Sequence, residues 1–159
     1  MRKALLVGGL LGLPATIGVN HEIPKARVTP DPRLERLQAF FAQHECPLRA
    51  VAADFLVAAD RNDLDWRLLP SISIIESSGG KDYRKNNVFG WDSCRAGFTS
   101  VREGIDFVAA QLANSKQYRD KNLDDKLSTY NPLPDYPARV KAVMRKLGPE
   151  GMAQMATLN

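Results

Sequence analysis

Apolar residues recur every three or four positions along most of the chain, and this spacing predicts amphipathic helices. One clear stripe is formed by Val101, Ile105, Val108 and Leu112. Turn-forming and polar residues interrupt the pattern at intervals of ten to twenty positions, as expected at helix ends. The sequence therefore predicts helices over residues 32–46, 48–60, 66–78, 99–114, 124–130 and 136–147.

Capping residues mark several of these helix ends. Asp31 followed by Pro32 is typical of an N-cap and a first helical position. The glycine pair that starts at Gly79 is expected to stop the third helix. A helix start at Thr99 has Arg102 where a full capping box would have an acidic residue.

The segment 81–98 breaks the helical pattern, because it is rich in Asn, Gly, Asp and Ser and shows no period. We expect a long irregular lobe or a small hairpin there. After Gly148 the tail is small and apolar, which favours a short final helix. These patterns together predict one all-α (mainly α) domain over residues 33–159.

The N-terminal segment, residues 1–19, is typical of an export signal. Its first three residues carry two positive charges, and no charged residue follows until after residue 19. The apolar stretch is shorter than the roughly twenty residues of a comfortable membrane span, which favours a signal over an anchor. An uncleaved membrane anchor is the alternative, because no clear cleavage site follows. Residues 20–32 contain three prolines and predict a linker. We expect an exported protein of the periplasm or cell envelope that contacts the membrane only if this segment stays uncleaved.

The amino-acid composition limits the classes of molecule that this protein is expected to bind. Hydrophobic residues make up 44% and charged residues 25%, the balance of a folded soluble domain. The net charge of +4 suits an anionic polymer, such as a cell wall. Because the chain has no run of Lys and Arg and only 8% aromatic residues, we do not expect nucleic-acid binding.

The cysteines and histidines argue against a metal site. Cys46 and Cys94 do not form a C-x-x-C pair, and His21 and His44 are far apart in the sequence. We expect neither a metal nor a cofactor. An even cysteine count in an exported protein predicts a Cys46–Cys94 disulfide, and two free buried thiols are the alternative.

Glu76 is the residue that we expect to carry chemistry. It follows Ile74 and Ile75 at the end of the most apolar predicted helix and precedes a glycine break. A carboxyl held half in the core is desolvated, and desolvation raises its pKa because the charged form loses more than the neutral form. Such a carboxyl can donate a proton to a glycosidic oxygen. The alternative is an ordinary surface glutamate at a helix end.

Four motifs in order resemble the lysozyme-like superfamily of peptidoglycan-cleaving enzymes. Residues 72–81, Ile-Ser-Ile-Ile-Glu-Ser-Ser-Gly-Gly-Lys, resemble the catalytic segment of lytic transglycosylases and of bacterial endo-β-N-acetylglucosaminidases. Residues 86–91, Asn-Asn-Val-Phe-Gly-Trp, resemble the "N-N-x-F-G" segment of the glucosaminidase branch. Residues 128–132 resemble the "A-Y-N" motif of lytic transglycosylases, and residues 136–140 resemble a tyrosine-containing helix start found near the site in both branches.

The resemblance implies a lysozyme-like fold and cleavage of β-1,4 glycosidic bonds in peptidoglycan glycan strands, with Glu76 as the catalytic acid and base. It implies that Tyr130 acts beside the scissile bond, by holding an N-acetyl group or Glu76. It also implies substrate contacts for Ser77, Asn87, Phe89, Trp91, Asn131 and Tyr136. The alternatives are that Phe89 and Trp91 fill the core below the lobe and that Tyr130 is a core tyrosine with a bonded hydroxyl.

Two departures from the family pattern leave the reaction open. The "G-L-M-Q" segment of many lytic transglycosylases is absent after Glu76, and no motif marks a second carboxylate among Asp82, Asp92 and Asp135. A hydrolase usually needs such a carboxylate as base or nucleophile. Lytic and hydrolytic cleavage therefore both remain, as does the bond cleaved. The rival functions are a non-catalytic wall-binding module and a domain that works with a protein partner in an envelope-spanning assembly.

Overall fold

The computed structural model describes residues 31–152, so the predicted signal or anchor (1–19) and most of the linker (20–32) lie outside the described residues. The described part is mainly helical, which confirms the predicted all-α class. Its elements in chain order are α1 (Pro32–Gln43), η1 (Pro47–Val51), α2 (Ala52–Arg61), α3 (Leu68–Ser77), η2 (Trp91–Cys94), α4 (Val101–Asn114), α5 (Leu123–Tyr130) and α6 (Tyr136–Leu147).

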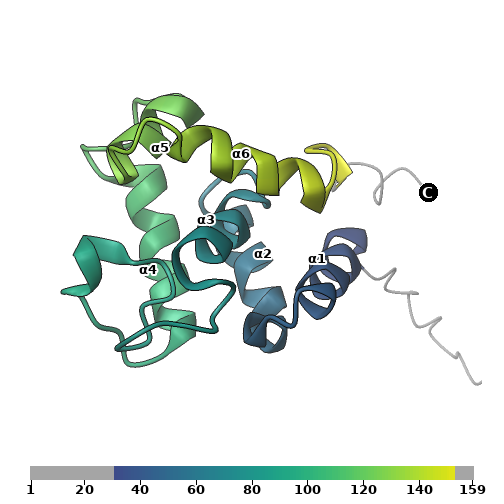
Figure 1. The fold of residues 1–159 in the computed structure, drawn as a ribbon. Coiled ribbons are helices and arrows are strands. Elements are labelled where there is room, and N and C mark those ends of the chain that lie inside the picture. The colour runs from purple at the N-terminus through teal and green to yellow at the C-terminus, as the bar shows by residue number, and fades with distance from the viewer. Residues whose placement is uncertain (1–30, 153–159) are drawn as a thin grey trace, which may run out of the picture.

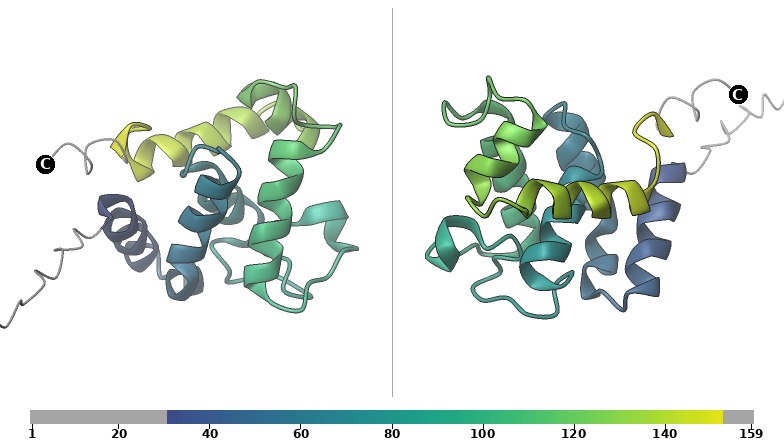
Figure 2. Two further views of the ribbon diagram at one scale, coloured as in Figure 1. Left: turned by 180° about the vertical axis from the view of Figure 1, so that it is seen from behind. Right: turned by 45° about the horizontal axis from the view of Figure 1, so that its top comes forward.

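Helix α3 lies at the centre of the molecule, and the other helices pack around it (Figure 1). Helix α6 runs across one side of α3, as the tilted view shows, and also contacts α5 and α1 (Figure 2). Helix α2 packs against α4, α1 and α3. Leu69 and Ile72 of α3 are fully buried, because this helix is apolar on almost every side.

Local chemistry explains most of the helix ends. Asp31 caps α1, since its carboxylate accepts a hydrogen bond from the Arg33 amide at 2.8 Å, and Pro32 stands at the first helical position as predicted. Helix α4 begins at Val101, two residues later than the predicted start at Thr99. Its N-cap is Ser100, whose hydroxyl accepts from the Glu103 amide at 3.1 Å, and the Glu103 carboxylate accepts from the Thr99 amide.

The turn after α3 requires a glycine. Ser78 ends the helix with a φ of 51°, and Gly79 follows with a φ of 70°. A Cβ atom at Gly79 would lie 2.3 Å from Sγ of Cys46, so no larger residue fits. The predicted stop at this glycine pair is confirmed, and it fixes where the last turn of α3 ends.

Residues 81–98 form the irregular lobe, with one isolated bridge between Arg84 and Asn87 and the short η2 helix. Val88 and Phe89 are fully buried and anchor the lobe in the helical core. The Asn86 side chain donates to the Phe98 carbonyl oxygen at 3.0 Å, which closes the lobe at its far end. The sequence predicted this lobe, and its apolar anchor explains why a segment without regular structure keeps a fixed position.

Candidate active site

Glu76 lies in the last turn of α3, half-buried, and lines a cavity of about 570 Å³. This volume is within the usual range for small-ligand sites. The cavity opens between the end of α3, the lobe and the C-terminal end of α5. Its lining residues are Glu76, Gly90, Trp91, Asp92, Ser93, Gln117, Tyr118, Thr129, Tyr130, Asn131 and Pro132.

Gly90 is packed directly against the carboxylate of Glu76. Its φ is 61°, and a Cβ atom built on it would lie only 2.8 Å from Oε2 of Glu76. Only glycine combines this backbone conformation with so close an approach. The "F-G" pair that the sequence singled out therefore places a bare backbone beside the acid, and this contact limits where the carboxylate can lie.

Tyr130 connects α5 to the lobe at the same point. Its hydroxyl donates a hydrogen bond to the Phe89 carbonyl oxygen at 2.6 Å, one residue before Gly90. Burial raises the pKa of Tyr130 well above its ordinary value, and the negative charge of Glu76 raises it further. The hydroxyl thus stays protonated at neutral pH. Tyr130 both lines the cavity and holds the backbone against which Glu76 rests.

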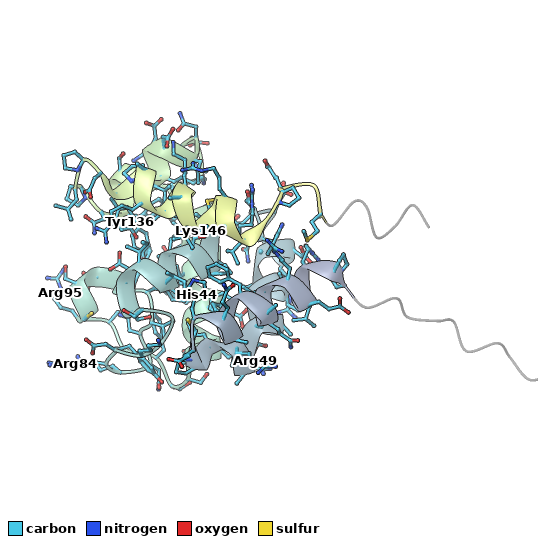
Figure 3. The ribbon with its side chains drawn as sticks, turned by 45° about the vertical axis from the view of Figure 1, so that its right-hand side comes forward. His44, Arg49, Arg84, Arg95, Tyr136 and Lys146 are labelled. Atoms are coloured by element: carbon cyan, nitrogen blue, oxygen red, sulfur yellow. The ribbon has the colours of Figure 1, made fainter. Side chains whose placement is uncertain are left out.

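Tyr136 is the first residue of α6 (Figure 3). Its ring stacks on Tyr130 with centroids 6.1 Å apart and 8° between the planes. The Tyr136 hydroxyl is buried and has no hydrogen-bond partner of good geometry. The Glu76 carboxylate is nevertheless close enough to influence the pKa of this hydroxyl. Burial raises the pKa of Tyr136, and the Glu76 charge adds to the increase. Tyr136 does not line the cavity, and it lies within electrostatic reach of Glu76.

Asn87 organises the lobe rather than the cavity. It is 1% exposed, and its Nδ2 donates to the carbonyl oxygens of Trp91 and Ala96 at 2.9 and 3.1 Å. Its Oδ1 accepts from the Trp91 amide at 3.0 Å. These bonds with the lobe backbone occupy the Asn87 side chain, which does not line the cavity. Through them, Asn87 fixes the segment that carries Trp91.

Two further residues with an implied substrate contact, Ser77 and Phe89, do not line the cavity. Ser77 is 3% exposed; its hydroxyl donates to the Ser73 carbonyl oxygen and accepts from the Gly80 amide, so it caps α3. Phe89 is fully buried and its ring lies 6.1 Å from that of Phe55, which makes it part of the core. Of the substrate contacts that the resemblance implied, the structure places only Trp91 and Asn131 on the cavity wall.

Three lining residues of the cavity, Gln117, Tyr118 and Thr129, were missed from the sequence. Gln117 and Tyr118 follow α4, and Thr129 precedes Tyr130 on α5. Lys126 joins these two segments, because its Nζ donates to the carbonyl oxygens of Leu112 and Tyr118 at 2.6 and 2.8 Å. The sequence did offer a signal for Tyr118, because it is the one aromatic residue in the polar stretch 114–122. A single aromatic side chain in such a stretch indicates a packing or binding contact.

Asp92 is the second carboxylate of the cavity wall. Of the three aspartates left open by the sequence, Asp82 and Asp135 do not line the cavity. Asp92 is exposed and forms an ion pair with Arg95. It also begins a run of non-glycine residues at positive φ, from 52° at Asp92 to 60° at Cys94. Backbone strain of this kind often collects at functional sites.

The predicted disulfide is absent from the structure. Cys46 is buried, with Sγ 3.6 Å from the His44 carbonyl oxygen, whereas Cys94 is exposed at the end of η2. The two residues belong to different parts of the fold, one before η1 and one in the lobe. Burial raises the pKa of Cys46, which makes it an unreactive core thiol.

The chemistry of the site is that of one half-buried carboxylate among aromatic rings, hydroxyls and amides. Within residues 31–152, no group of three or more His, Cys, Asp or Glu side chains is placed to hold a metal ion. None of the helices in that range is long and apolar enough to cross a membrane. Such a site can give a proton to, or take one from, an uncharged polar ligand.

No family model, no curated protein and no solved structure matches this chain.

Proposed function

We propose that this chain cleaves β-1,4 glycosidic bonds in the glycan strands of bacterial peptidoglycan, with Glu76 as the general acid. One observation carries the proposal. The motif residues Glu76, Trp91 and Tyr130, which are up to 54 positions apart in the sequence, line one cavity of about 570 Å³ together with Asn131. Residues that merely shape a core have no reason to meet at a solvent-accessible cavity.

The arrangement suits acid catalysis on a neutral sugar. Glu76 would protonate the leaving oxygen, and its contact with Gly90 restricts the carboxylate to a narrow range of positions. Trp91 offers an aromatic face to a sugar ring, and the side chains of Asn131, Thr129 and Gln117 can exchange hydrogen bonds with its hydroxyl and amide groups. We propose a lysozyme-like arrangement for the same reason: a helix end delivers the acid to a cleft between a helical body and an irregular lobe.

Asp92 favours hydrolysis over the lytic reaction in this proposal. It shares the cavity wall with Glu76, as a second carboxylate that activates water must do. Because peptidoglycan lies outside the cytoplasm, the proposal includes export to the periplasm or cell envelope by the segment 1–19. A partner in an envelope-spanning assembly remains compatible with the linker, and this proposal does not depend on one.

Digestion of purified peptidoglycan sacculi tests the function. We expect Glu76→Gln to abolish release of soluble fragments, because it keeps the side-chain shape and removes the proton donor. The matched control is Glu45→Gln, which changes an exposed glutamate between α1 and η1 and should digest normally. Glu76→Gln with activity within threefold of the parent chain would remove Glu76 as the acid. Mass spectrometry of the fragments identifies the reaction: reducing ends mean hydrolysis, and anhydro-muramyl ends mean lytic cleavage.

A further inference from the structure

An aromatic surface continues outward from the cavity through Trp91. The Trp91 ring contacts Tyr130 inside the cavity, with centroids 5.6 Å apart. The Trp91 ring also meets Phe107 of α4 edge-on at 5.9 Å, and Phe107 in turn lies 5.4 Å from Phe98. We call Trp91, Phe98 and Phe107 the aromatic platform. Only Trp91 of the three lines the cavity itself.

Phe107 is not needed for the core. The buried residues of α4 are Gly104, Ile105, Val108, Ala109 and Leu112. Phe107 points away from that stripe and remains 40% exposed. Phe107 does not stand alone, because its ring packs against Trp91 and Phe98, and such a group of aromatic rings beside a cavity is a candidate binding surface.

The charged side chains next to Phe107 on α4 already have partners within the fold. Glu103, one turn earlier, accepts hydrogen bonds from the amide and hydroxyl of Thr99. Asp106 lies 4.0 Å from the guanidinium of Arg61. The surface therefore offers aromatic rings to a ligand and little unpaired charge, which suits the apolar face of an uncharged sugar ring.

We propose that the aromatic platform binds a sugar ring of the glycan strand outside the cavity. This proposal depends on the proposed function. A cavity of about 570 Å³ holds a small ligand, so a polymer that reaches Glu76 must continue over the neighbouring surface. Trp91 belongs to both the cavity and the platform, so a strand that leaves the cavity along this ring next meets Phe107.

The test compares KM and kcat for glycan strands of different lengths. Soluble glycan strands without stem peptides are prepared as a ladder, from the shortest fragment that is cleaved to long chains. We expect Phe107→Ala to raise KM for long strands roughly three- to tenfold, the range of one lost aromatic contact, with kcat unchanged. KM for the shortest fragment should not change. Phe107→Trp keeps a ring and should restore the parent KM.

The control is Tyr83→Ala, which removes an aromatic ring of the lobe with a similar exposure of 41% and should leave both constants unchanged. A change in KM that is equal for short and long strands, or no change, would overturn the platform.

Calorimetric binding of long strands to the Glu76→Gln chain, with and without Phe107→Ala, separates the two proposals. If the chains with and without Phe107→Ala bind long strands with equal affinity, the platform is refuted. If Phe107→Ala weakens this binding but the parent chain does not cleave the strands, only the proposed enzymatic function is refuted. Self-association that is lost in Phe107→Ala, at unchanged strand affinity, would assign this surface to protein contacts and overturn the sugar site.

Discussion

Gly90→Ala is the sharpest perturbation of the candidate site, because it touches the acid without changing it. The added Cβ would lie 2.8 Å from Oε2 of Glu76, whereas ordinary contact begins at 3.4 Å. The carboxylate must therefore move by the difference, about 0.6 Å. A displacement of about 1 Å of a reacting group can slow catalysis on the order of a hundredfold. We expect kcat to fall roughly ten- to a hundredfold.

The stability cost of Gly90→Ala should be small. The Gly90 φ of 61° strains any residue with a Cβ, at about 1 kcal/mol. The atom in the way is the end of a flexible side chain, which can move without disturbing the core. For a domain of this size, about 1 kcal/mol lowers Tm by roughly 3–5 °C. Initial rates of sacculus digestion and thermal unfolding by circular dichroism measure the two effects separately.

Gly148→Ala is the matched control. Gly148 also has a positive φ, 139°, and a Cβ there would meet the flexible end of Met152 at 3.1 Å. It follows the last residue of α6, whereas Tyr136 begins that helix, so the two ends are roughly 18 Å apart. We expect a lower Tm and normal turnover. If Gly90→Ala turns over within threefold of the parent, the position of the Glu76 carboxylate does not govern the reaction, and the reasoning above is wrong.

Two further predictions concern single side chains. Tyr130→Phe removes the donor to the Phe89 carbonyl oxygen, so we expect the free energy of unfolding to fall by about 1–3 kcal/mol and turnover to fall with it; an unchanged denaturation midpoint would contradict the importance of this bond. Thiol labelling under non-reducing conditions should modify one cysteine in the folded chain, the exposed Cys94, and two after denaturation, because burial raises the pKa of Cys46 and keeps it protonated. Finding no reactive thiol in the denatured chain would restore the disulfide.

The sequence by itself determined the helices and the place of Glu76 near a helix end. The spacing of apolar residues reports which side of a helix is buried, and caps such as Asp31 and Gly79 act on their own neighbours, so both are readable locally. Glu76, Trp91, Tyr130 and Asn131 were singled out from motifs and lie on one cavity.

Tertiary structure decided what the remaining polar and aromatic residues do. A motif cannot show that the Asn87 amide bonds the lobe backbone instead of a ligand, because its partners follow it by four and nine residues in a segment without regular structure. Gln117 and Tyr118 line the cavity in a segment that Lys126 of α5 contacts, since its Nζ donates to the Tyr118 carbonyl oxygen, and the sequence does not reveal this contact. Whether an aromatic ring fills the core, as Phe89 does, or stays exposed, as Phe107 does, depends on which element packs over it, and that is a property of the assembled fold.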